Sequence, residues 1–324
     1  MRIEGEGFPL DAALPHARIG PERARLRHAS SSVLTVLVPD GLEGGTTAIR
    51  IDELPGETAF VEIGAPFVTG VHQVDSPAYD RHGNLFVTFS GSRGQQAPVS
   101  VFIVRPNGTR EPFVSDVPNP TSLAFDRAGR LYVSSRFDGS VYRIEADGRA
   151  TLYASELGVA CGLAFGPDDV LYVGDRSGSI LRVEPSGRAR AFAAVPSSVA
   201  AFHLAFGPDD HLYVTAPTLS TNDVVYRIAP DGTVSAWCHG LGRPQGLAFD
   251  AAGRLYVVDA LAGASGVYRL RLDAPDEPEQ VLAGGALIGL AFDPHGGIAL
   301  AASETVYRLS VGIKGLLPLQ STHQ

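Results

Sequence analysis

The segment "ACGLAFGPDDVLYVGD", residues 160–175, contains two short apolar stretches separated by a four-residue turn. Close variants of it occur at residues 120–135, 202–216, 244–260 and 287–302, for example "PTSLAFDRAGRLYVSS" and "PQGLAFDAAGRLYVVDA". A constant period of about 40 residues is typical of repeat architectures such as propellers and solenoids. The aromatic residue that ends the first stretch falls at Tyr79, Phe125, Phe165, Phe206, Phe249 and Phe292, so the successive differences are 46, 40, 41, 43 and 43 residues.

Each repeat predicts four short antiparallel strands. The two apolar stretches form the first two strands, and the turns between them, such as "DRAG" and "DPHG", supply Asp and Gly for tight turns. A third strand follows in "SVYRIEADG" (140–148) and a fourth in "RATLYASE" (149–156), and no helical period is visible. Four short strands per repeat are typical of a propeller blade, so we expect an all-β, six-bladed β-propeller.

The two ends of the repeat region predict how the ring closes. The last third strand, "ETVYRLSV", ends at Val311, and too little chain follows to supply a fourth strand. The segment "GETAFVEIGAPFVTG" (56–70) has the pattern of a fourth strand without a blade before it. We therefore expect residues 57–64 to complete the sixth blade, which would remove an exposed sheet edge. The alternative is a solenoid of sheets, but the capping repeats that a solenoid usually needs are not visible.

The first 55 residues do not share the period. The stretches "RIEGEGF" and "LTVLVPDG" resemble parts of an immunoglobulin-like TIG domain, although the usual first strand of that domain is missing. We therefore expect a partial immunoglobulin-like β segment over residues 1–55 and the propeller over residues 56–324.

Composition and charge narrow the possible partners. The chain has 35 acidic and 26 basic residues, a net charge of −9, and no basic stripe, so a nucleic acid partner is not expected. No apolar run reaches the length of a membrane span, and "MRIEGEGFPL" lacks the features of a signal peptide. A cytoplasmic location is expected, while an exported form stays open if a signal peptide was removed. Cys161 and Cys238 fall at different phases of the repeat, which argues against a disulfide.

The variable edges of the repeat predict a ligand site. Loops between blades and loops between second and third strands share one face of a propeller, so their side chains surround one mouth of the central channel. Pre-formed concave sites of this kind are the usual places for small-molecule binding. The candidate ligand-binding residues on this face are His72, Gln73, Asn119, Thr121, Arg136, Asp175, Arg176, Gln245 and Asp259.

The repeats "LAFDRAGRLYVSS" and "GLAFDAAGRLYVVDA" resemble those of NHL-type propellers and of the senescence-marker-protein/gluconolactonase family, over residues 57–311. The resemblance implies a lactone hydrolase with one divalent metal, usually calcium, held by Glu, Asn and Asp side chains at the channel mouth. In this chain Asp75 stands at the Glu position and Cys161 at the Asn position. Phe202 stands at the Asp position, or His203 if the strand is shifted by one residue. Two of the three ligands have therefore changed type.

Three interpretations of Cys161 and His203 stay open. With Asp75 they could bind a softer metal, because thiolate, imidazole and carboxylate suit Zn²⁺ better than Ca²⁺. Cys161 and His203 could instead form a nucleophile and base for acyl transfer. In the third interpretation these residues only pack in the protein interior, since Cys is among the most buried residue types. The candidate catalytic and metal-binding set is therefore Asp75, Cys161 and His203, and no organic cofactor is expected.

Two further pairs on this face have open roles. Asp175 and Asp259 end second strands and could bind a ligand or accept hydrogen bonds from loop amides. Arg136 and Arg176 could hold a carboxylate or phosphate, or could pair with nearby acids. Two functions from different classes follow: hydrolysis of a lactone or small ester, or non-catalytic binding of a small molecule or a protein partner through the same face. The fold alone does not choose between them.

Overall fold

The computed structural model describes residues 1–11, 14–54, 56, 58–71, 76–92, 94, 97–200, 202–260 and 264–316. The chain divides into two compact units, Met1–Pro66 and Phe67–Gln324. Every regular element in the described ranges is a β-strand. No helix in those ranges has the length and apolar character that a membrane crossing requires.

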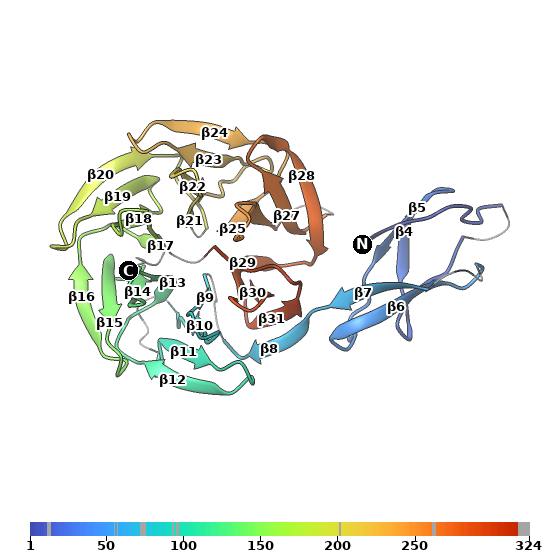
Figure 1. The fold of residues 1–324 in the computed structure, drawn as a ribbon, viewed down its shortest axis with the longest axis horizontal. Helices are drawn as coiled ribbons and strands as arrows, with labels where there is room; N and C mark the ends of the chain where they lie inside the picture. Colours follow the sequence, from blue (N-terminus) through green and yellow to red (C-terminus); the bar gives the residue numbers. More distant parts are fainter. Residues whose placement is uncertain are drawn as a thin grey trace, which may run out of the picture. The chain divides into compact units, whose positions relative to one another are not determined.

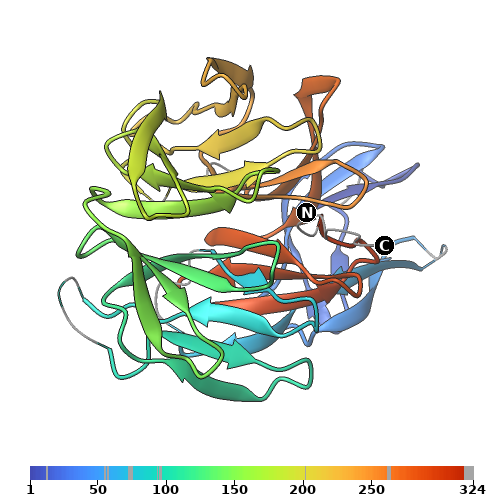
Figure 2. The same cartoon turned by 60° about the vertical axis from the view of Figure 1, so that its left-hand side comes forward.

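In the described part of residues 65–316, six four-stranded antiparallel sheets lie around a common centre, with the first strand of each sheet innermost (Figure 1). Figure 2 shows the same sheets from another side, each of them twisted. The prediction of an all-β chain built from four-stranded sheets, as in a β-propeller, is confirmed. The strands are β9 (Ala78–Tyr79), β10 (Leu85–Thr88), β11 (Val101–Val104) and β12 (Arg110–Val114); β13 (Pro120–Phe125), β14 (Leu131–Ser135), β15 (Ser140–Ile144) and β16 (Ala150–Ala154); β17 (Ala160–Phe165), β18 (Leu171–Asp175), β19 (Ser179–Val183) and β20 (Ala189–Ala194); β21 (His203–Phe206), β22 (Leu212–Thr215), β23 (Val225–Ile228) and β24 (Val234–Cys238); β25 (Pro244–Phe249), β26 (Leu255–Asp259), β27 (Gly266–Arg271) and β28 (Ala274–Ala283); β29 (Leu287–Phe292), β30 (Gly297–Ala302), β31 (Thr305–Ser310) and β8 (Ala65–Thr69).

The turn between the first two strands of a sheet is built in two related ways. In the "DRAG" turn, the carboxylate of Asp126 accepts hydrogen bonds from the backbone N–H and the Nε of Arg130, and Gly129 supplies the positive φ of 79°. In the "GPDD" turn, Gly166 replaces Asp126, and Asp169 adopts the positive φ of 59°. Asp tolerates this backbone conformation better than most residues, so both sequences produce the same tight turn.

Aromatic rings join neighbouring sheets. Tyr132 of β14 meets Phe165 of β17 edge to face, with ring centroids 4.9 Å apart. The same contact recurs around the ring, so the aromatic residue of each repeat is explained by packing. Tyr79 is the exception: Ala299 of β30 takes the place of a tyrosine, and the Tyr79 ring packs in the same apolar cluster as Ala299. The equivalent pairs are Phe86–Phe125, Tyr172–Phe206, Tyr213–Phe249 and Tyr256–Phe292.

Ring closure differs from the sequence prediction. Residues 57–64 do not complete the last sheet: β7 (Ala59–Ile63) pairs with β6 (Gly45–Ile51) in the first unit. The strand that joins β31 is β8, which follows directly. The physical reason is burial, because Val68 of β8 is 7% exposed and packs in the cluster that contains Val306 of β31. The side chains of β7 are exposed or half-buried.

The first unit contains two small antiparallel sheets. One has the strand order β1-β5-β4 and the other β3-β2-β6-β7. Their buried centre consists of Ala17, Ile19, Ala24 and Val36. Residues 56–66, which the sequence analysis assigned to the propeller, fall in this unit. Its remaining strands are β1 (Arg2–Glu4), β2 (Ala17–Ile19), β3 (Glu22–Arg23), β4 (Arg25–Ala29) and β5 (Val33–Leu37).

Candidate functional site

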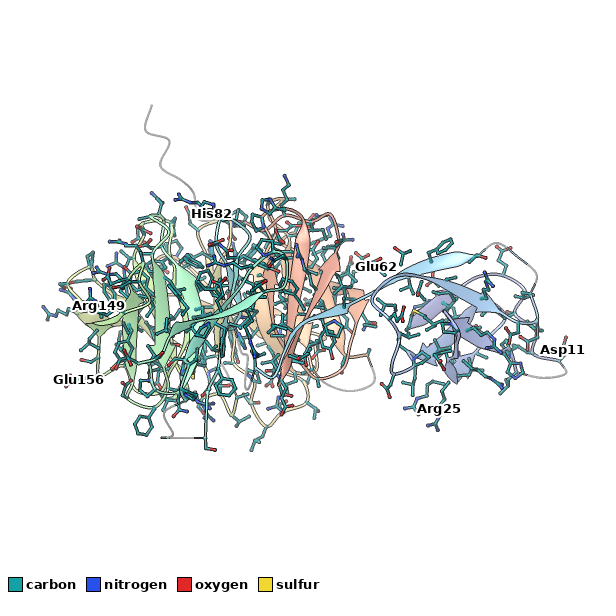
Figure 3. The ribbon with its side chains drawn as sticks, turned by 90° about the horizontal axis from the view of Figure 1, so that it is seen from below. Asp11, Arg25, Glu62, His82, Arg149 and Glu156 are labelled. Carbon is teal, nitrogen blue, oxygen red and sulfur yellow. The ribbon has the colours of Figure 1, made fainter. Side chains whose placement is uncertain are left out.

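The second unit has two end faces. Pairing of Pro120 with Ser135 and of Phe125 with Leu131 places the loops between sheets at one end of the inner strands and the first turns at the other. Figure 3 shows the two ends, with His82 of a first turn on one side and Glu156 of a loop between sheets on the opposite side. The predicted ligand residues that the structure describes belong to the end that Glu156 marks.

At that end, the two predicted aspartates hold loops in place. Asp175 accepts a hydrogen bond from the backbone N–H of Val159 at 2.7 Å. Asp259 accepts two, from the backbone N–H of Gly242 at 2.9 Å and of Arg243 at 2.6 Å. Asp175 also accepts a hydrogen bond from the Ser177 hydroxyl. Asp175 is 9% exposed and Asp259 is 5% exposed, so both buried carboxylates are bonded to groups of the loops.

Asn119 and Thr121 also contact backbone groups of the loops. Asn119 has a positive φ of 41°, its Oδ1 accepts the N–H of Gly94 at 2.8 Å, and its Nδ2 donates to the carbonyl of Gly91 at 2.9 Å. Thr121 is buried, and its hydroxyl lies 3.4 Å from the carbonyl oxygen of Asn119. These contacts explain the polar residues at the loop between β12 and β13 without a ligand.

The two predicted arginines contact neutral groups. The guanidinium of Arg136 donates to the Ser90 hydroxyl at 3.2 Å, and that of Arg176 donates to the carbonyl of Val199 at 3.0 Å. Gln245 is half-buried on β25, and its backbone carbonyl accepts a hydrogen bond from the Thr215 hydroxyl. His72, Gln73 and Asp75 lie outside the described residues.

Cys161 and Phe202 are buried in apolar surroundings. Cys161 is 2% exposed on β17 and belongs to the cluster that contains Phe202 and Leu204. Phe202 is 1% exposed, and its ring fills the space beside Gly174, where an added Cβ would lie 2.4 Å from the ring. Phe202 therefore occupies the position equivalent to Cys161, and His203 occupies the next one, which faces the centre of the ring.

The cavity lies at the centre of the ring and opens at the other end, among the first turns. It has a volume of about 520 Å³ and is lined by all six inner strands. Its walls are mainly apolar, and the inner strands that form them surround the centre of the ring (Figure 1). The apolar wall residues include Leu123, Leu163, Leu204, Leu247 and Leu290, together with the aromatic residues Phe125, Phe165, Phe206, Phe249 and Phe292.

His203 and Ser76 lie at the inner end of this cavity. The Nδ1 atom of His203 is 3.1 Å from the Ser76 hydroxyl, and these residues belong to the first and fourth sheets, which lie on opposite sides of the centre (Figure 1). The other repeats have Gly or Ser at this position, so the imidazole is the largest side chain there. Burial lowers the pKa of His203 to about 4, so the ring is neutral at neutral pH. The equivalent residues are Ser76, Ser122, Gly162, Gly246 and Gly289.

Among the described residues that line the cavity, the charged ones lie at its outer end. They are Arg127, Asp169 and Asp210, all on the first turns. Asp169 accepts the backbone N–H of Arg127 at 2.8 Å. The segment after β31 reaches the same rim, where the N–H of Leu316 donates to the carbonyl of Phe249 at 3.0 Å.

The described residues do not fit a calcium site. Among them, no group of three or more His, Cys, Asp or Glu side chains is arranged to hold a metal ion. Calcium requires several oxygen ligands. At two of the three family positions, the structure instead places a buried thiol and a phenyl ring in an apolar cluster.

Sequence reasoning identified His203 but missed Ser76, Ser122 and the rim residue Arg127. A signal was available, because the position before the conserved "LAF" is Gly or Ser in most repeats and His in one. That signal becomes informative only when this position is known to face the centre.

Solved structures with the same fold include a gluconolactonase from Xanthomonas campestris, with a TM-score of 0.63 and 16% sequence identity over 98% of this chain and 100% of that one. The calcium-binding protein regucalcin from Agrobacterium tumefaciens has a TM-score of 0.62 and 16% identity over 79% and 96% of the two chains. Virginiamycin B lyase from Staphylococcus aureus has a TM-score of 0.56 and 16% identity over 96% and 99%. No family model and no curated protein matches this chain. At these identities the likeness establishes the β-propeller fold.

Proposed function

We propose that this chain is a six-bladed β-propeller that binds a small, largely apolar molecule in its central cavity. The observation that carries the proposal is the cavity of about 520 Å³, whose walls are formed by the inner strands and whose inner end contains His203 and Ser76. A mainly apolar wall with a few polar groups at one end is typical of small-molecule sites. We also propose that residues 1–66 form an immunoglobulin-like unit, which could serve as a contact for a protein partner.

A titration with 2-naphthol tests the binding proposal. Replacing Ala205 of the cavity wall by Phe should fill part of the cavity and weaken binding at least about tenfold, since steric overlap removes favourable contacts. The matched control is Ala236→Phe on the exposed face of β24, which should leave binding unchanged. Urea unfolding of both variants checks that the fold is retained. Equal affinity of Ala205→Phe and the unmodified protein would contradict a site in this cavity.

A second candidate function is metal-dependent hydrolysis of a lactone or small ester. Two observations favour it: the likeness to gluconolactonase structures, and the position of His203 in the central cavity. In that case Asp75 and His203 would be ligands of one divalent ion, either Ca²⁺ or Zn²⁺, whereas Cys161, which is buried in the apolar cluster with Phe202, would not be one. The test is metal analysis and a lactone-hydrolysis assay, with and without chelator. Unchanged metal content and turnover in Asp75→Ala would remove this candidate.

A further inference from the structure

We infer that the central cavity selects uncharged ligands that carry one hydrogen-bonding group, which meets Ser76 and His203, and that it rejects carboxylates and other anions. This inference rests on the proposed function and specifies the ligand class. It concerns the end of the channel opposite to the face predicted from the sequence.

The first step is the distribution of charge along the cavity. The described charged residues that line it, Arg127, Asp169 and Asp210, belong to the turns at its mouth. Arg127 is engaged there, since its guanidinium donates to the carbonyl of Pro167 at 2.5 Å. Behind this rim, the described lining residues are apolar or neutral. A carboxylate in the inner half would therefore lose its hydration without gaining a cation, which is strongly unfavourable.

The second step is the state of His203. Its side chain is 4% exposed and carries no positive charge at neutral pH, because burial disfavours the charged form. The imidazole therefore cannot act as the missing counter-ion for an anion. It is a neutral hydrogen-bonding ring at the inner end of an apolar cavity.

The third step is the hydrogen-bonding capacity at the inner end. A serine hydroxyl has one donor and two acceptor sites, so its bond with His203 leaves Ser76 further capacity toward the cavity. A hydroxyl or carbonyl at one end of an apolar ligand can use this remaining capacity of Ser76, whereas a fully apolar ligand cannot.

The experiment compares naphthalene, 2-naphthol and 2-naphthoate, which share one ring system, by calorimetric titration at pH 7.5. We expect 2-naphthol to bind about tenfold more tightly than naphthalene, and 2-naphthoate to bind at least about 30-fold more weakly than 2-naphthol. In His203→Phe the preference for 2-naphthol over naphthalene should largely disappear. In the control His295→Phe, on an exposed first turn outside the cavity lining, the preference should remain.

The outcomes separate the two proposals. If 2-naphthoate binds as tightly as 2-naphthol, the selectivity inference is wrong while binding in the cavity stands. If none of the three probes binds, the proposed function itself fails, and the inference fails with it. The comparison of the three probes uses the unmodified protein, so it does not depend on the folding of any variant.

Discussion

Lowering the pH from 7.5 to 5 should destabilise the second unit, because His203 takes up a proton more readily in the unfolded chain than in the folded one. Burial lowers the pKa of His203 from 6.5 to about 4 in the folded protein. In this pH range the unfolded chain therefore binds more protons than the folded chain, and stability rises with pH. The stabilisation is fully present above the unfolded pKa and is lost as the pH falls toward 4.

The size of the effect follows from the two pKa values. A difference between about 6.5 and about 4 corresponds to a maximum of about 3 kcal/mol. At pH 5 most of the unfolded imidazole is protonated and most of the folded imidazole is neutral. The free energy of unfolding should therefore fall by about 2 kcal/mol between pH 7.5 and pH 5 because of this residue alone.

Urea unfolding followed by tryptophan fluorescence is a suitable assay. The chain has one tryptophan, Trp237 on β24, in the same sheet as His203 and edge to face with Tyr213. His203→Gln keeps a neutral hydrogen-bonding side chain that does not titrate. The unmodified protein should lose about 2 kcal/mol more than this variant between the two pH values. Parallel losses in both proteins would refute the burial argument.

Three further substitutions test the packing of the ring, each by urea unfolding. Asp259→Asn should lower the free energy of unfolding by about 1–3 kcal/mol, because two loop amides lose a charged acceptor, whereas the exposed control Asp231→Asn, which accepts one such bond, should lose less. Gly174→Ser should lower the free energy of unfolding by more than about 2 kcal/mol, because the Phe202 ring fills that space. Combining it with Phe202→Ala should give a double variant that is more stable than the sum of the two single losses predicts. Tyr79→Phe should leave the free energy of unfolding unchanged or raise it by up to about 1 kcal/mol, since the buried hydroxyl has no hydrogen-bond partner among the described residues. A fall in the free energy of unfolding by more than about 1 kcal/mol would contradict that description.

The repeat carried most of the fold information. The period, the turn residues and the aromatic positions are all local or regularly spaced, so the sequence alone predicts four-stranded sheets around a centre. The prediction of ring closure was wrong because β7 and β8 are consecutive strands of similar pattern, separated by Gly64. The choice between them depends on whether Val68 can enter the cluster with Val306, and this long-range contact leaves no local signal.

The candidate site was less predictable for a related reason. Asp175 and Asp259 could bind a ligand or hold a loop, and only the positions of the Val159 and Gly242 amides decide between these roles. The location of a cavity depends on the sizes of side chains from all six sheets together. Polar residues occur at both ends of the inner strands, so their presence does not indicate which end is open.

The position occupied by His203 departs from the rest of the repeat. Packing between sheets requires the Leu and Phe of each "LAF" segment, and these residues hardly vary. The preceding position lies where neighbouring inner strands approach closely, because a Cβ added at Gly162 or Gly246 would lie 2.3 Å or 2.5 Å from backbone atoms of the next sheet. In the fourth sheet an imidazole occupies this position and reaches Ser76 on the opposite side of the centre. The ligand preference that we propose therefore depends on this one departure from the repeat, and a larger side chain at Gly162 or Gly246 should lower stability, because its added atoms would meet backbone of the next sheet rather than open space.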